Sequence, residues 1–209
     1  MVTPFDAMNA LGLVAFGTVG ALKAADAEFD VLGVAVLGVL TALGGGATRD
    51  VLVGRVPAIL QSTTDVGFAF AGVALAVVLA RRVGAGLLDH PAVVLPDAIG
   101  LAAFAASGAL VGVDAGVSPF GVVVLGTVTG VGGGLVSDVL LQRVPFVLTE
   151  DFYATCAVAG SAALWLVVEF AGAGPGLGAA AGAGSTLALR LLAIRFDWRL
   201  PTVRLDAAT

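Results

Sequence analysis

One stretch of this sequence occurs twice and decides how the chain folds. Residues 44–60 read GGGATRDVLVGRVPAIL, and residues 132–148, which lie 88 positions later, read GGGLVSDVLLQRVPFVL. Ten of the 17 positions are identical, including the glycine triplet, the aspartate, the second arginine and the proline. Residues 12–16 match residues 100–104 at the same offset, with Gly and Phe at the ends of both. We therefore interpret the chain as two copies of one structural unit.

The composition is that of a membrane protein. Of the 209 residues, 59% are hydrophobic and only 12% are charged, and the mean hydropathy is +1.07. A soluble domain carries about 25% charged residues, because its surface faces water. The low charge therefore predicts that most of the outer surface faces lipid, and that residues 1–209 form a single membrane domain.

The apolar segments are long enough to cross a bilayer, which takes about 20 residues per helix. We expect an all-α integral membrane protein with seven transmembrane helices, near residues 7–24, 31–54, 65–82, 92–113, 117–141, 152–172 and 176–195. Repeat one would cover about 5–84, repeat two about 92–172, and an accessory helix about 176–195. Each repeat holds three spans, an odd number, so the two copies cross the membrane in opposite directions. The predicted architecture is an inverted 3+3 repeat plus one accessory helix.

The basic residues predict an orientation, because loops rich in lysine and arginine stay in the cytoplasm. Seven spans leave only Arg49 and Arg55 on one side. The other side holds Lys23, Arg81, Arg82, Arg143, Arg195, Arg199 and Arg204. We therefore expect a multi-pass protein of the cell membrane with its N-terminus outside and its C-terminus in the cytoplasm.

Two glycine triplets lie late in the second and fifth spans: Gly44, Gly45, Gly46, Gly132, Gly133 and Gly134. Each glycine disfavours a helix by up to about 1 kcal/mol relative to alanine. A kink or an unwound turn is expected at each triplet, with freed backbone groups facing a hydrated path near the membrane midplane. The alternative is that the glycines only permit close helix packing, as small residues often do.

Polar residues accompany both triplets and are the candidate lining of such a path: Thr41, Thr129, Arg49, Asp50, Ser137 and Asp138. Ionisable groups inside a membrane are costly, so they are expected to pair or to line a hydrated path. The alternative is that they lie at the membrane interface. The two threonines could offer oxygen ligands to a cation or bond back to their own helices.

Other functional classes find little support in the sequence. The glycine triplets lack the Gly-Lys-Ser/Thr ending of a phosphate-binding loop, and no paired carboxylates with a nearby histidine suggest hydrolysis. The single cysteine, Cys156, supplies neither a disulfide framework nor a metal cluster. We expect no enzyme activity, no cofactor, no metal other than K⁺ in transit and no nucleic-acid partner.

The doubled Gly-Gly-Gly-x-x-(Arg/Ser)-Asp motif, in a chain of three, three and one spans, resembles the prokaryotic relatives of the trimeric intracellular cation (TRIC) channels. This group includes bacterial proteins with a glycine-transporter-like domain. The resemblance implies a homotrimer in lipid, with one pore per protomer kinked at the two triplets. It also implies conduction of K⁺ and some Na⁺, with Arg49, Asp50, Ser137 and Asp138 near the path.

Two other functions remain open at this point. Inverted repeats with broken helices are as typical of secondary transporters, so a carrier of a small amino acid such as glycine is the alternative. A membrane subunit without any pore is the third possibility.

Overall fold

The computed structural model describes residues 2–83, 90–149, 152–198 and 200, and all regular secondary structure within them is helical. Its elements are α1 (Pro4–Asp26), α2 (Val31–Leu52), the short η1 (Ala58–Leu60), α3 (Thr63–Val83), α4 (Pro91–Asp114), α5 (Pro119–Leu140), the short α6 (Phe146–Thr149), α7 (Tyr153–Trp165), its π-helical continuation η2 (Leu166–Phe170) and α8 (Pro175–Phe196). Seven spans are long and apolar enough to cross a membrane, with α7 and η2 forming the sixth. The predicted seven-helix fold is confirmed.

Three positions used in the predictions lie outside the described residues. They are Arg199 and Arg204, which contributed to the predicted orientation, and residue 84, the expected end of repeat one. The observed spans otherwise begin and end within about three residues of the expected ones, the scatter usual for helix ends.

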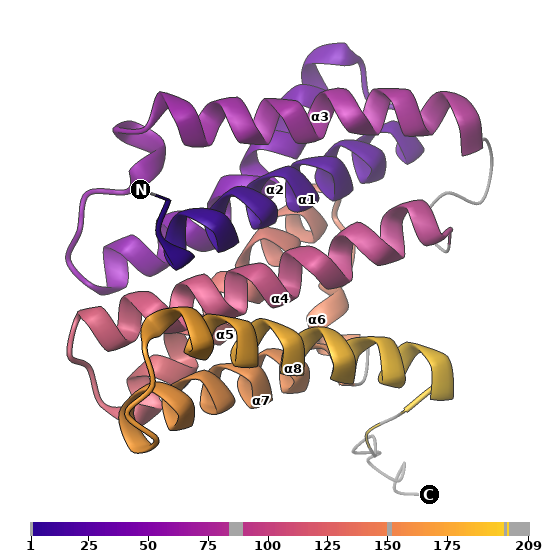
Figure 1. Ribbon diagram of the computed structural model, residues 1–209. Coiled ribbons are helices and arrows are strands. Elements are labelled where there is room, and N and C mark those ends of the chain that lie inside the picture. Colours follow the sequence, from indigo (N-terminus) through magenta and orange to yellow (C-terminus); the bar gives the residue numbers. More distant parts are fainter. Residues whose placement is uncertain (1, 84–89, 150–151, 199, 201–209) are drawn as a thin grey trace, which may run out of the picture.

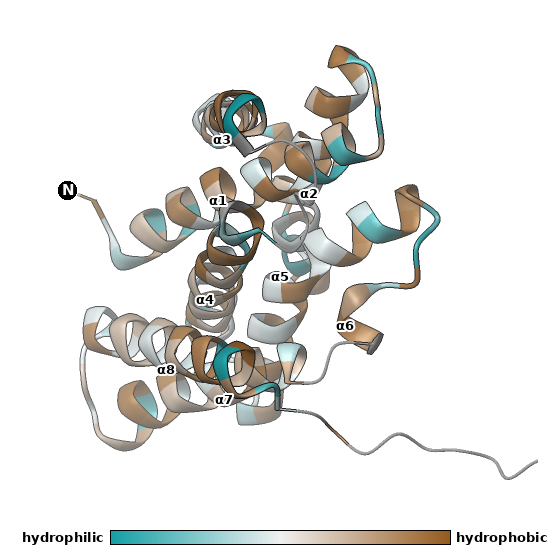
Figure 2. Cartoon of the chain, turned by 90° about the vertical axis from the view of Figure 1, so that its right-hand side faces the viewer, coloured by the Kyte–Doolittle hydropathy of each residue, from teal (hydrophilic) through white to brown (hydrophobic). Residues whose placement is uncertain are grey.

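The helices form two groups that pack through α1 and α4, which run in opposite directions (Figure 1). Helix α1 packs against α2 and α3, and α4 packs against α5, α7 and α8. A second contact joins the groups where α2 packs against α5. In Figure 2 the helices are mostly brown or white, and teal is concentrated in loops and at helix ends. The two polar ends of the bundle therefore face water and its sides face lipid.

Polar caps at matching positions start the second helix of each group. The Asp30 side chain accepts a hydrogen bond from the Gly33 N–H at 2.7 Å, and the Ser118 hydroxyl accepts one from Gly121 at 3.2 Å. Such caps satisfy backbone N–H groups that a helix start leaves unpaired. Asp30 and Ser118 are 88 residues apart, so the repeat extends to the helix boundaries.

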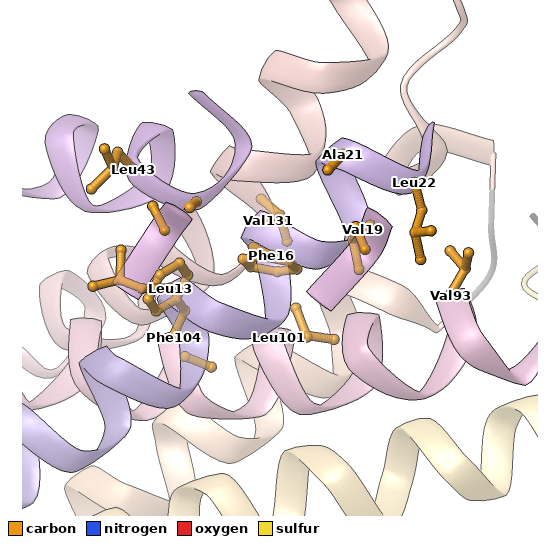
Figure 3. Close-up of a cluster of buried hydrophobic side chains, with 14 of the residues drawn as sticks. Leu13, Phe16, Val19, Ala21, Leu22, Leu43, Val93, Leu101, Phe104 and Val131 are labelled. Carbon is orange, nitrogen blue, oxygen red and sulfur yellow. The ribbon is translucent and has the colours of Figure 1, made fainter. Parts of the chain in front are cut away.

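The core between the groups is built from another matched pair. Phe16 of α1 and Phe104 of α4 pack with their ring centroids 5.3 Å apart, and Figure 3 shows Leu13 and Leu101 beside them. Each ring lies over a glycine of the opposite helix: a Cβ at Gly100 would come within 2.9 Å of the Phe16 ring, and one at Gly12 would collide with the Phe104 ring. Aromatic rings over side-chain-free backbone let α1 and α4 approach closely.

Candidate functional site: a glycine crossing between two polar ends

The two glycine triplets meet where α2 and α5 cross. A Cβ at Gly45 would collide with the carbonyl oxygen of Thr129, and one at Gly133 would collide with that of Thr41. A Cβ at Gly132 would come within 2.8 Å of the Gly45 Cα. The backbones of the two helices are therefore in direct contact, and no larger residue fits at the centre of the crossing.

The expected unwound turns are absent from both helices. Helix α2 is continuous from Val31 to Leu52 and α5 from Pro119 to Leu140, so each passes through its triplet without interruption. The prediction of freed backbone groups at Gly44–Gly46 and Gly132–Gly134 is wrong in this structure. Tertiary packing outweighs the low helix propensity of glycine, because only glycine permits this contact. Close packing, the alternative interpretation, is what the structure shows.

The two threonines bond back to their own helices. The Thr41 hydroxyl donates to the Leu37 carbonyl at 2.6 Å, and the Thr129 hydroxyl donates to the Leu125 carbonyl, also at 2.6 Å. Both side chains are fully buried. The hydroxyl groups therefore satisfy local carbonyls, and only the carbonyl oxygens of Thr41 and Thr129 face the opposite triplet.

The first polar end, called the Asp50 end, lies after the triplet of α2. Arg49 Nη2 and Nε bond the same carboxylate oxygen of Asp50, at 2.7 and 2.9 Å. The Arg49 guanidinium also lies over the Phe5 ring, 5.4 Å from its centroid. The Arg49 side chain is only 3% exposed. The cation at this end therefore comes from the residue next to the aspartate and is held on two sides.

The second polar end, called the Asp138 end, lies after the triplet of α5 at the opposite end of the molecule. Here the cation is Lys23 from α1, whose Nζ is 2.7 Å from Asp138 Oδ1 and 3.4 Å from the Ser137 hydroxyl. Ser137 stands where repeat one has Arg49. A lysine from another helix thus supplies the charge that the motif itself lacks.

The same backbone holds both aspartates. The second carboxylate oxygen of Asp50 accepts from the Ala58 N–H at 2.9 Å, and that of Asp138 accepts from the Phe146 N–H at 2.8 Å. These donors are again 88 residues apart. The Arg-Val-Pro segment that the two repeats share lies between each aspartate and the residue that donates this N–H. Each motif is therefore a helix end whose aspartate ties down the following loop.

The candidate residues are thus buried within the protein and paired. Arg49, Asp50, Ser137 and Asp138 are all buried in the structure. A buried charge without a partner is costly, which explains why each aspartate has one cation.

Sequence reasoning missed four further residues of the Asp138 end. Lys23 was used only to predict orientation. Tyr153 donates its hydroxyl to Asp97 at 3.0 Å, and the buried Arg190 of α8 lies over the Tyr153 ring at 4.8 Å. Asp97 stands 88 residues after Asn9, which is polar too and lies at the other end. That matched polarity within an apolar span was the available signal.

A small cavity of about 10 Å³ lies at the Asp50 end. Asn9, Gly46, Arg49, Asp50 and Asp65 contribute to its lining. Its volume corresponds to about one water molecule. Arg49 Nη1 is buried and has no hydrogen-bond partner in the described part of the chain, so this end has a hydrogen-bond donor that a water or ligand could use.

Comparison with known families agrees with this architecture. The model of the glycine transporter family matches twice, at residues 6–81 and 94–169. A UPF0126 membrane protein of Deinococcus radiodurans is 39% identical, over 95% of this chain and 91% of its own length. The UPF0126 membrane protein YvgT of Bacillus subtilis is 36% identical, over 97% of this chain and 98% of its own length.

Solved structures of TRIC cation channels have the same fold. One is 38% identical with a TM-score of 0.83, covering 98% of this chain and 99% of the other. A prokaryotic TRIC channel is 27% identical with a TM-score of 0.85, covering 94% and 98%. The TRIC orthologue of Rhodobacter sphaeroides is 28% identical with a TM-score of 0.83, covering 93% and 98%. These relatives are channels rather than enzymes, in line with the expectation from the sequence. The chain belongs to the prokaryotic TRIC channel family, which includes the bacterial glycine-transporter-like proteins.

Proposed function

We propose that this protein is a passive channel for monovalent cations, K⁺ and also Na⁺, with a path through each protomer of a homotrimer in the cell membrane. We place the N-terminus outside and the C-terminus in the cytoplasm. The observation that carries the proposal is a helix crossing without side chains, with one buried aspartate beyond it at each end, in a chain that has the fold of TRIC cation channels.

The proposed path runs along the contact of α2 and α5. The two backbones touch at Gly45 and Gly133, so the path is closed in this arrangement. At the centre of the crossing the contact is between backbones, so a separation of the helices there has no interlocked side chains to displace at Gly45 and Gly133. Separation uncovers the carbonyl oxygens of Thr41 and Thr129, which the opposite glycines now cover. Carbonyl oxygens are ligands that replace the hydration shell of K⁺ in channels.

The aspartates give this path its preference for cations. Asp50 and Asp138 place a carboxylate beyond each side of the crossing, where a permeating cation enters or leaves. Rings or pairs of carboxylates attract cations and repel anions at such positions. Arg49 and Lys23 each offset one of these charges, which stabilises the buried carboxylates.

The test is a planar-bilayer recording of the purified protein under a KCl gradient. We expect unitary currents that reverse near the K⁺ equilibrium potential and persist, at a different amplitude, in NaCl. A reversal at the Cl⁻ potential, or no unitary current from protein shown to be folded, would contradict the proposal.

Transport of glycine is the second candidate, and the name of the family whose model matches favours it. Proteoliposomes that take up labelled glycine saturably, without unitary currents, would establish it. If neither unitary currents nor glycine uptake is observed, the conclusion is that the protein is a structural membrane subunit.

A further inference from the structure

At two positions of the repeat, one copy has a basic residue and the other does not, and the copy that has it differs between the two positions. Repeat one has Arg49 in the motif and repeat two has Ser137 there. On the first helix of each repeat the choice is reversed, with Lys23 in repeat one and Val111 in repeat two. Lys23 therefore reaches across to the other repeat and occupies the place of the missing arginine beside Asp138.

The two cations are held very differently. Arg49 has two nitrogens on one carboxylate oxygen, the Phe5 ring against its face and a side chain that is 3% exposed. Lys23 makes a single short contact to Asp138 and a longer one to Ser137, and its side chain is 14% exposed. Lysine carries a compact charge on a flexible four-carbon stem, which can extend toward water at a helix end.

The lysine ammonium marks a place that suits a free monovalent cation. It is a compact single charge, and it sits 2.7 Å from a carboxylate oxygen and 3.4 Å from a hydroxyl oxygen. A cation that bound the same two oxygens would need the volume that Nζ now fills. Lys23 and the cation therefore exclude one another at Asp138. The guanidinium of Arg49 is less exposed than Lys23, and the Phe5 ring and two contacts to one Asp50 oxygen hold it in place.

We propose that Lys23 is a tethered competitor of the permeant cation. Its ammonium neutralises Asp138 at rest, and a cation crossing this end displaces it, whereas Arg49 stays on Asp50 throughout. The proposal rests on the proposed function and identifies the residue that sets how strongly one end of the path binds its ion.

The first experiment measures unitary current while K⁺ is varied on one side of the bilayer only. The variant Lys23→Val carries the residue that repeat two has at this position. We expect the half-saturating K⁺ concentration on the Asp138 side to fall about five- to tenfold, the size of effect expected on losing one partly exposed ion-pair competitor. The value on the Asp50 side should not change. Arg143→Val, which removes an exposed cation at the same end, is the matched control.

A double variant tests whether the arginine of the repeat-one motif can replace Lys23 at the Asp138 end. Lys23→Val with Ser137→Arg installs the arrangement of repeat one at the Asp138 end. An arginine beside Asp138 is held more firmly than the lysine, so the half-saturating K⁺ concentration should rise to at least the wild-type value. This variant also keeps Asp138 paired, which protects the fold if Lys23→Val alone is unstable.

The second experiment does not need conduction. Thermal unfolding in detergent is compared in KCl and in N-methyl-D-glucamine chloride at equal ionic strength. Lys23→Val should be stabilised by K⁺ more than by the bulky cation, and Lys23→Val with Asp138→Asn should show no difference. If Lys23→Val shows no K⁺-specific stabilisation, the inference is overturned, whether or not the protein conducts.

The outcomes separate the two proposals. A wild-type protein without K⁺ current overturns the proposed function alone, while the K⁺-specific shift still decides the role of Lys23. In a conducting protein, an unchanged half-saturating concentration in Lys23→Val, or an equal change in Arg143→Val, overturns the inference and leaves the channel proposal intact.

Discussion

The Asp50 end and the Asp138 end share a backbone and differ in their charges. In both, an aspartate follows a glycine triplet and accepts the N–H of the residue eight positions later. The cation beside it is a neighbouring arginine at one end and a lysine from another helix at the other. The backbone contact is the same because the turn requires it. The charge needs only to be within reach, so any nearby helix can supply it.

The largest effect should come from neutralising the two aspartates. Asp50→Asn leaves Arg49 buried without its partner, and we expect a loss of about 3–5 kcal/mol in the free energy of unfolding. Asp138→Asn should cost less, about 1–3 kcal/mol, because Lys23 can extend into water. Denaturant unfolding in detergent measures both. Equal losses would mean that the two ends hold their cations alike.

The next effect concerns the crossing, where the two repeats should respond in the same way. Gly45→Ala and Gly133→Ala place a methyl group against a backbone carbonyl, and each should destabilise the protein by about 1–3 kcal/mol. Gly134→Ala meets no atom within 4 Å, and Gly46→Ala meets only the Arg49 guanidinium, in ordinary contact at 3.6 Å, so the two are matched controls. The controls should be neutral or stabilising by up to about 1 kcal/mol, because alanine favours the helix.

The same four variants separate packing from conduction. If the path follows this crossing, Gly45→Ala and Gly133→Ala should also lower the unitary conductance, and the controls should retain it. Conductance that survives in both buried variants would place the path elsewhere.

A smaller and equal effect is expected from the two buried threonines. Thr41→Val and Thr129→Val each remove one hydrogen bond to the carbonyl four residues earlier, at a cost of about 1 kcal/mol. Thr48→Val removes a similar bond at an exposed site and should cost clearly less. Thermal unfolding of the three variants compares them. A marked difference between Thr41 and Thr129 would break the symmetry of the centre.

The smallest effect should come from two exposed ion pairs that join the repeats. Arg55 pairs with Asp114 at 2.7 Å, and Arg143 pairs with Asp26 at 3.5 Å. The two arginines are 88 residues apart, and so are the two aspartates. Exposed pairs contribute about 0–1 kcal/mol, so Arg55→Ala and Arg143→Ala should shift stability only slightly. Both shifts should shrink further at high salt. A loss of stability above that range that does not depend on salt would show that these residues stabilise the protein by something other than the ion pair.

The candidate site illustrates where sequence reasoning failed. The positions of Asp50 and Asp138 in the two motifs led to the expectation that they pair or line a hydrated path, and both are paired. The partner of Asp138 could not be predicted, because Lys23 is 115 residues away and no local pattern links the two. The glycine triplets were expected to kink or unwind their helices; neither helix unwinds, because propensity is weak compared with a close tertiary contact.

The sequence by itself determined the class of fold. Hydropathy sets the number of membrane spans because lipid tolerates only apolar helices, and the internal repeat sets their opposite directions because three is odd. Only the tertiary structure decided that the triplets are a point of contact and that α1 neutralises the second motif. Those facts depend on which helices cross, and the energy of a crossing comes from atoms that are distant along the chain.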